Sequence, residues 1–182
     1  AVSRMVGTAT SQGRLREADR VFSVAFWLFF FLGLFGCLVM FFGANQIAQW
    51  YGSPESNFAI MALAPTLFFI SIESSIRGYF QGRSNMVPTA TSQTIEAVTK
   101  VIIGVGLAFY IIQNFEVDRD RWAAVGAIVG VSVSAGLGAI YLLGCKFVQG
   151  RRDRRRGLGE EEPLTSRQQT LINLVRFAVP IT

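Results

Sequence analysis

Four long apolar segments constrain the fold of this chain more than any other feature. They cover residues 21–42, 58–80, 86–112 and 122–147. Each has the length of about 20 residues that a helix needs to cross the hydrocarbon core of a bilayer. The sequence therefore predicts an all-α polytopic membrane protein, folded as a bundle of transmembrane helices embedded in a lipid bilayer.

The composition supports this fold class and argues against several functions. Only 16% of the residues are charged, whereas a soluble domain usually carries about 25%. The net charge of +5 comes without the basic face and polar readout groups that nucleic-acid binding requires. Histidine is absent, and we find no glycine-rich phosphate loop and no zinc-ligand spacing. We therefore predict no catalytic residue, no metal site and no cofactor.

Basic and non-basic connections alternate along the chain. Arginines gather in residues 1–20, in the 81–85 turn and in the 148–170 segment, whereas 43–57 and 113–121 carry no basic excess. Because cytoplasmic loops carry the excess of Lys and Arg, we expect the first three of these segments to be cytoplasmic. Trp50, Tyr51, Tyr110 and Trp122 would then form an aromatic belt at the outer interface.

The segments outside the four spans suggest a part of a longer chain. Residues 1–20 are expected to be the cytoplasmic end of a preceding helix and a loop, and 171–182 the start of a following span. The sequence does not begin with Met, so we expect a fragment. Residues 148–170 resemble a linker, basic at Arg151–Arg156 and then acidic. Its basic run either anchors the topology or binds anionic lipid headgroups.

Two spans carry charge at membrane depth. Thr89, Gln93, Glu96 and Lys100 fall within about 60° of one another on a helical wheel. The second span contributes Glu73 and Arg77. An unpaired charge at mid-membrane costs about 2.5–3.5 kcal/mol on insertion scales, so these groups must be paired, hydrated or neutralised. Intrahelical pairing is possible, because Glu73 with Arg77 and Glu96 with Lys100 are four residues apart.

Two interpretations of this polar stripe remain open from the sequence. It could line a hydrophilic cavity that contacts cargo or a coupling ion, or it could be a structural cross-brace between two helices. The candidate residues for the first interpretation are Glu73, Arg77, Gln81, Thr89, Ser92, Gln93, Glu96 and Lys100.

The fourth span has small residues at strict intervals of four: Gly126, Gly130, Ser134 and Gly138. Such a ridge lets a neighbouring helix approach closely, so we predict helix packing here. The alternative is a flexible gating helix, because glycine weakens a helix. Cys37 and Cys145 lie at different depths and are not expected to form a disulfide.

Several motifs resemble a known transporter family. The segment Arg77-Gly78-Tyr79-Phe80-Gln81-Gly82, then Met86-Val87-Pro88-Thr89-Ala90 and Ser92-Gln93 with Glu96, is similar to the hairpin of helices four and five in the polysaccharide-flippase branch of the multidrug/oligosaccharidyl-lipid/polysaccharide exporters. The opening Ala1–Val6 resembles the end of helix two. The closing Leu174–Ile181 resembles the entry to helix seven.

This resemblance implies most of one six-helix lobe of a two-lobed transporter in the bacterial cytoplasmic membrane. The implied cargo is a polyprenyl-pyrophosphate-linked saccharide, such as a lipid II-like peptidoglycan precursor, moved by alternating access with a possible coupling cation, Na⁺ or H⁺. Two alternatives stay open: a cation-coupled multidrug exporter of the same superfamily, and a non-transporting membrane scaffold for cell-wall or spore-coat assembly.

Overall fold

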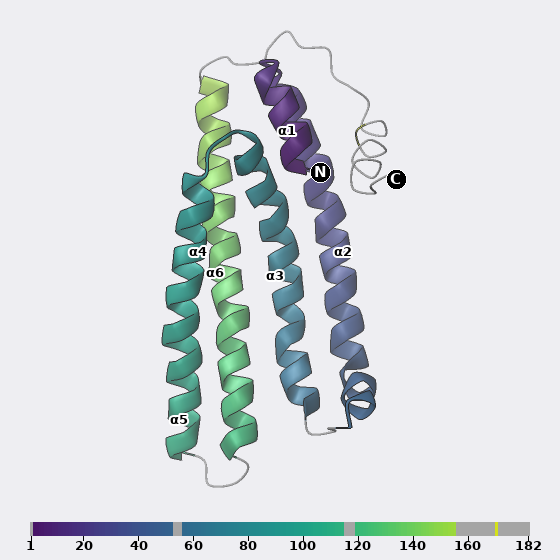
Figure 1. The fold of residues 1–182 in the computed structure, drawn as a ribbon, viewed down its shortest axis with the longest axis vertical. Helices are drawn as coiled ribbons and strands as arrows, with labels where there is room; N and C mark the ends of the chain where they lie inside the picture. Colours follow the sequence, from purple (N-terminus) through teal and green to yellow (C-terminus); the bar gives the residue numbers. More distant parts are fainter. Residues whose placement is uncertain (1, 53–55, 115–118, 156–169, 171–182) are drawn as a thin grey trace.

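The computed structural model describes residues 2–52, 56–114, 119–155 and 170 of the 182-residue chain. A short helix, α1 (Val2–Ser11), precedes three long ones, α2 (Leu15–Trp50), α3 (Asn57–Gly82) and α6 (Arg119–Arg155). Between α3 and α6, α4 (Val87–Thr99) and α5 (Gly106–Asn114) are joined by a π-helical turn, η2 (Lys100–Val105). Figure 1 shows these helices side by side, with α4 and α5 continuous through the turn.

The predicted fold class is confirmed. Among the described residues, four stretches are long and apolar enough to cross a membrane: Leu15–Trp50, Asn57–Gly82, Val87–Asn114 and Trp122–Asp153. The helices extend beyond the apolar segments, because backbone hydrogen bonding continues into the polar flanks. At 1.5 Å per residue α6 is about 55 Å long, nearly twice the thickness of a hydrocarbon core of about 30 Å. The basic residues Arg151 and Arg152 therefore belong to a helix and not to a loop.

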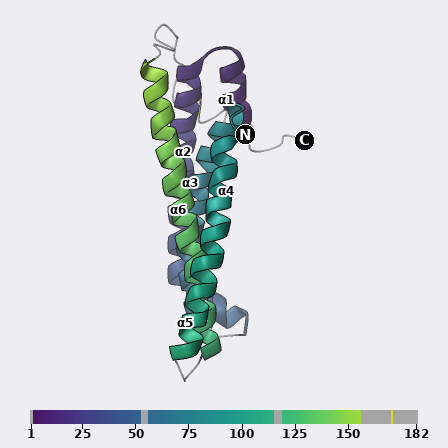
Figure 2. The ribbon, with the colours of Figure 1, turned by 90° about the vertical axis from the view of Figure 1, so that its left-hand side faces the viewer.

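The packing order differs from the order in the sequence. Helix α2 packs along α3, and α6 packs along both α3 and the α4–η2–α5 helix. Although α3 and α4 are joined by a short turn, they touch each other far less than each touches α6. Figures 1 and 2 show α6 beside both of them over most of their length. Helix α6 is therefore the element that holds α3 and α4 in one bundle.

One end of the bundle carries the α1–α2 connection, the α3–α4 turn and the last turns of α6; we call it the basic end (top in Figure 1). The main buried cluster lies toward this end and includes Val6, Ile76, Tyr79, Phe80 and Leu142. Large apolar side chains elsewhere are exposed, for example Phe31, Phe35 and Phe42 on α2. An apolar exterior of this kind is what lipid contact requires.

Helix α1 packs on α3 across two glycines. A Cβ atom on Gly78 would lie 3.2 Å from the Val2 side chain, and one on Gly82 would lie 2.6 Å from the Val6 Cβ and 2.7 Å from the Ser3 carbonyl oxygen. Glycines four residues apart on one helix face allow this close approach. The structure thus assigns both glycines of the 77–82 motif to the α1–α3 contact.

A proline inside α3 lies beside a polar contact with α6. Pro65 lacks an N–H and cannot complete the helical hydrogen-bond ladder. Ser132 of α6 donates a hydrogen bond to the Ala62 carbonyl (2.6 Å) and lies 2.7 Å from the Thr66 hydroxyl. The carbonyl that loses its helical partner at Pro65 is that of Met61, so Ser132 adds a contact between α3 and α6 beside the proline and does not replace the missing bond.

Candidate functional site

Arg77 joins two carboxylates from two different helices. Its Nη2 atom lies 2.8 Å from Glu73 Oε2, one turn earlier on α3. The same atom donates a hydrogen bond of 2.8 Å to Glu96 Oε2 on α4. The predicted pair of Glu73 and Arg77 is therefore present, and the guanidinium also ties α3 to α4.

Glu73 is the most buried member of this cluster. Its side chain is 1% exposed, against 22% for Arg77 and 17% for Glu96. It lies directly against Gly138 of α6, where a Cβ atom would overlap its Oε1. Neither carboxylate oxygen of Glu73 accepts a hydrogen bond within the described part of the chain. The ion pair with Arg77 is thus the main compensation for burying this charge, since a buried charge without a partner is strongly destabilising.

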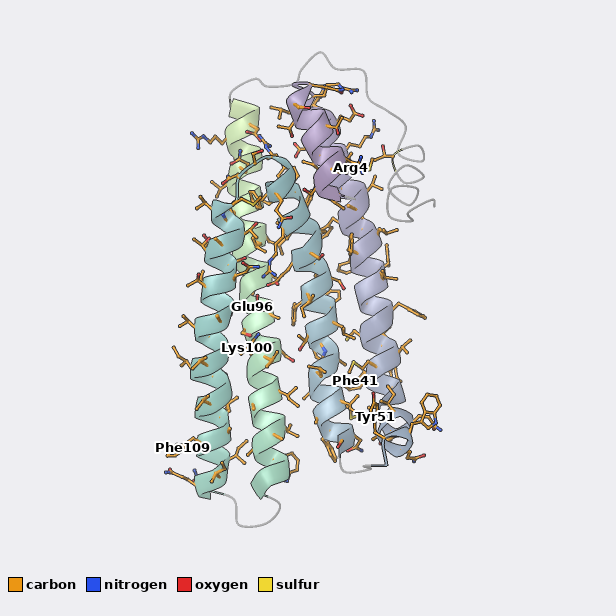
Figure 3. The ribbon with its side chains drawn as sticks, in the orientation of Figure 1. Arg4, Phe41, Tyr51, Glu96, Lys100 and Phe109 are labelled. Atoms are coloured by element: carbon orange, nitrogen blue, oxygen red, sulfur yellow. The ribbon has the colours of Figure 1, made fainter. Side chains whose placement is uncertain are left out.

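Lys100 forms the looser, more exposed side of the cluster. Its Nζ atom lies 3.9 Å from Glu96 Oε1, and its side chain is 45% exposed. Figure 3 shows Glu96 and Lys100 one above the other along the α4–η2 helix. Counting Glu73, Arg77, Glu96 and Lys100, two acids face two bases, so the cluster is formally neutral.

The other candidate residues are placed unevenly. Thr89 and Ser92 are buried, and the Ser92 hydroxyl donates to the Thr89 carbonyl at 2.8 Å. The Thr89 hydroxyl has no hydrogen-bond partner among the described residues. Gln93 and Gln81 are exposed. The predicted stripe is therefore buried at Thr89 and Ser92, half-buried at Glu96, and exposed at Gln93 and Lys100.

The small-residue ridge of α6 faces the α4–η2–α5 helix at two of its four positions. A Cβ atom on Gly126 would lie 2.6 Å from Ile111, and one on Gly130 would overlap the backbone of Gly104. Ser134 is buried and donates to its own helix at the Val131 carbonyl. Gly138 accommodates the Glu73 carboxylate instead of a backbone. Position 138 thus belongs to the charged cluster as well as to the ridge.

The π-helical turn η2 lies where this ridge is closest. It starts at Lys100 and contains Gly104, whose backbone touches Gly130. A π-helical turn has a wider, irregular hydrogen-bond pattern and occurs frequently at functional sites. Glu96 lies in the last turn of α4 and Lys100 is the first residue of η2, so the charged cluster lies at the junction between the regular helix α4 and the irregular turn.

A second polar network lies at the basic end and joins α2, α3 and α6. Asp19 Oδ1 accepts hydrogen bonds from the Tyr79 hydroxyl (2.9 Å) and from Lys146 Nζ (2.5 Å). Arg83 Nη1 donates to the same hydroxyl and to Asp153 Oδ2, both at 2.6 Å. Lys146 Nζ also lies 3.6 Å from the centre of the Tyr79 ring, in cation–π range.

These contacts change the electrostatics at the end of α3. Burial disfavours a charged Arg83, but its hydrogen bonds to Asp153 and Tyr79 outweigh burial and raise the pKa of the guanidinium. Sequence reasoning missed this network, because its contacts between helices join residues 60 to 127 positions apart. The spacing of four residues between Tyr79 and Arg83 does not reveal those contacts. The one available signal was Lys146, a charge in the last part of an apolar segment without an acidic residue one turn away.

Comparison with known proteins places this architecture in a family. The model of the family described as "Polysaccharide biosynthesis protein" matches residues 6–182. The chain belongs to this family. The resemblance drawn from the hairpin motif is thereby confirmed.

Three proteins similar to this chain come from Bacillus subtilis (strain 168). Stage V sporulation protein B is 25% identical over 185 residues, covering all of this chain and 34% of the relative. The uncharacterized membrane protein YabM is 28% identical over 154 residues, 83% of this chain and 28% of the relative. Lipid II flippase MurJ is 25% identical over 154 residues, 78% of this chain and 28% of the relative. The chain thus spans about a third of the length of these relatives, and no solved structure matches it.

Five of the six residues of the 77–82 motif contribute to contacts with other helices. Arg77 joins the acids, Gly78 and Gly82 admit α1, and Tyr79 belongs to the network at the basic end. Phe80 is buried in the main cluster, and Gln81 is exposed. One helical turn and a half therefore faces three different neighbours.

Replacing Gly138 with alanine is expected to lower the free energy of unfolding by about 1–2 kcal/mol, because the added Cβ displaces the Glu73 carboxylate from Arg77. Unfolding in mixed micelles, followed by far-UV circular dichroism, measures this change. In a Glu73→Ala background the same substitution should have almost no effect, because the obstructed side chain is gone.

Gly136→Ala is the matched control for this prediction. Its Cβ would lie 3.5 Å from the Phe69 ring, an ordinary contact. An equal loss for Gly136→Ala and Gly138→Ala, or a loss that persists in the Glu73→Ala background, would show that the Glu73 carboxylate does not determine the requirement for glycine at 138.

Proposed function

We propose that this chain is the larger part of one lobe of a flippase that moves a lipid-linked saccharide or peptidoglycan precursor across the bacterial cytoplasmic membrane. The family match over residues 6–182 carries this proposal, supported by relatives that include a protein named lipid II flippase. The charged cluster supports it as well, because ionisable groups inside a membrane bundle mark substrate or ion pathways more often than not.

The four charges of the cluster divide into two roles in this proposal. Arg77 and Lys100 attract the pyrophosphate of the cargo or balance the acids. Glu96, together with Glu73, sets the electrostatic potential around the charged cluster and is the candidate site of a coupling cation, Na⁺ or H⁺. Lys100 of the cluster and the neighbouring Gln93 are exposed, so they are the first side chains to meet a cargo that enters the space beside α4.

The orientation follows from the basic end. We place the 1–20 segment, the 81–85 turn and the 148–170 segment in the cytoplasm, since all carry arginine and the described parts lie at one end of the bundle. The run Arg151–Arg156 would then lie at the inner leaflet and attract anionic lipids. The linker from Gly157 to Ser166 and the start of a further span at 171–182 lie outside the described residues.

The decisive experiment uses a full-length protein that carries this sequence, produced in cells depleted of their own lipid II flippase. Lipid II in the outer leaflet is detected with an externally added cleaving enzyme. Restored cleavage is the expected result, and Glu96→Gln should reduce it several-fold while leaving the amount of folded protein in the membrane unchanged. Normal transport by a well-folded Glu96→Gln variant would contradict the coupling role.

A non-transporting scaffold is the second candidate, favoured by the complete burial of Glu73 against Gly138. In that case the cluster is a cross-brace, and the Glu96→Gln and Lys100→Gln variants alter stability or partner binding without changing the distribution of any lipid between leaflets. No restoration of lipid II cleavage, combined with efflux of organic cations from the same cells, would instead indicate a multidrug exporter.

A further inference from the structure

A cavity at the basic end lies between α1 and α2, apart from the charged cluster. Its volume is about 210 Å³, and its polar lining consists of Arg4, Thr8, Arg14 and Glu17. Apolar atoms of Met5 and Val21 complete the wall. Figure 3 shows Arg4 on α1, where this helix lies beside the first turns of α2. The lining of the cavity therefore combines guanidinium groups with hydrocarbon.

The charges around this cavity favour an anion. Two guanidinium groups and one carboxylate line it, which gives a formal excess of one positive charge. The Arg14 guanidinium already pairs with Glu17 Oε2 at 2.6 Å and donates to Gln12 Oε1. The Arg14 side chain is 41% exposed, and a guanidinium carries five N–H donors, so it has donors left for a further acceptor. Arginine presents a planar fork of donors that binds phosphate through two parallel hydrogen bonds. A phosphate could thus be held by Arg4 and Arg14 while Glu17 keeps its place.

The position of the cavity indicates the source of the phosphate. It lies where the polar start of α2 meets the apolar segment that begins at Val21, which is the level of lipid headgroups. Its volume is below the range of about 300–1,000 Å³ typical of pockets for larger ligands, so it suits a phosphate with a small alcohol and not an oligosaccharide. The apolar wall fits the first carbons of an acyl chain.

We propose that the cavity between α1 and α2 is a binding site for the headgroup phosphate of an anionic phospholipid, with Arg4 and Arg14 as its ligands. This site differs from the Arg151–Arg156 run, whose first residues, Arg151 and Arg152, lie on α6. It concerns a resident lipid that fixes α1 against α2 and does not depend on which cargo the transporter moves.

The test uses a full-length protein that carries this sequence, purified in a neutral detergent, and native mass spectrometry counts the retained lipids. Phosphatidylglycerol and phosphatidylcholine with identical acyl chains are the probes. We expect one phosphatidylglycerol to be retained at concentrations where phosphatidylcholine is lost. Arg4→Gln and Arg14→Gln should each weaken this retention about tenfold, as expected for loss of a charge-assisted hydrogen bond.

Arg16→Gln is the matched control, because Arg16 is an exposed arginine of the same segment that does not line the cavity. It should leave the retention unchanged. Arg14→Lys keeps the charge and loses the planar fork of donors, so it should weaken phosphatidylglycerol binding less than Arg14→Gln. It also tests the proposal if the glutamine variant folds poorly. Circular dichroism verifies the helix content of each variant.

Three results would overturn the proposal. Equal retention of the two phospholipids would show an adaptable apolar surface without a phosphate site. Equal loss in Arg14→Gln and Arg16→Gln would show general attraction to surface charge. Displacement of phosphatidylglycerol by undecaprenyl diphosphate at a lower concentration would make the cavity a site for a lipid-linked diphosphate.

Discussion

Replacing Arg77 with glutamine is expected to lower the free energy of unfolding by about 3 kcal/mol, because removing one partner of a buried ion pair leaves the other charge uncompensated. Glu73 is 1% exposed, and within the described residues its carboxylate oxygens accept no hydrogen bond that could replace the ion pair. The loss should also separate α3 from α4, since the same Nη2 atom bonds Glu96. Mixed-micelle unfolding followed by circular dichroism measures it.

A double variant and a control distinguish this mechanism from a general loss of charge. Glu73→Gln combined with Arg77→Gln should be more stable than Arg77→Gln alone, because the uncompensated carboxylate is removed. Lys100→Gln should lower stability by less than about 1 kcal/mol, since Lys100 is half exposed and 3.9 Å from its partner. Additive losses in the double variant would show that Arg77 and Glu73 do not depend on each other.

Gly82→Ala is expected to lower the free energy of unfolding by about 2–3 kcal/mol, at the upper end of the range for overpacking a tight contact. The added Cβ would lie 2.6 Å from the Val6 Cβ and 2.7 Å from the Ser3 carbonyl oxygen. Backbone atoms of α1 cannot rotate away as a side chain can, so α1 must shift as a whole. The same mixed-micelle measurement applies.

The control for this substitution is Gly144→Ala on α6. A Cβ at position 144 would meet nothing within 4 Å, and alanine is favoured over glycine in a helix by up to about 1 kcal/mol. Gly144→Ala should therefore be neutral or slightly stabilising. A Gly82→Ala variant that is as stable as Gly144→Ala would mean that α1 does not depend on the close approach at Gly82.

Arg77 illustrates how much of the candidate site the sequence predicts. Its pairing with Glu73 follows from a spacing of four residues on one helix, and so does the pairing of Glu96 with Lys100. The contact between Arg77 and Glu96 does not follow from any such spacing, because it depends on how α3 and α4 are rotated and displaced. That arrangement is decided by α6, which packs along both helices.

Gly138 also shows what a spacing pattern in the sequence cannot predict. Its spacing with Gly126 and Gly130 correctly indicates a face that needs small residues, but the pattern treats all positions alike. Two of them meet the η2 and α5 segments, whereas Gly138 meets a carboxylate. A periodic pattern reports that space is required and does not report which group occupies it.

The sequence by itself determined the class of this protein, its four membrane-spanning helices and the pairs of charges within each helix. These properties depend on hydrophobic length and on helical periodicity, which act along the chain. Only the tertiary structure decided that Arg77 joins two helices, that Gly78 and Gly82 admit α1, and that Asp19, Tyr79, Arg83, Lys146 and Asp153 form one network. Such contacts join residues far apart in the chain, and their geometry is set by how whole helices pack.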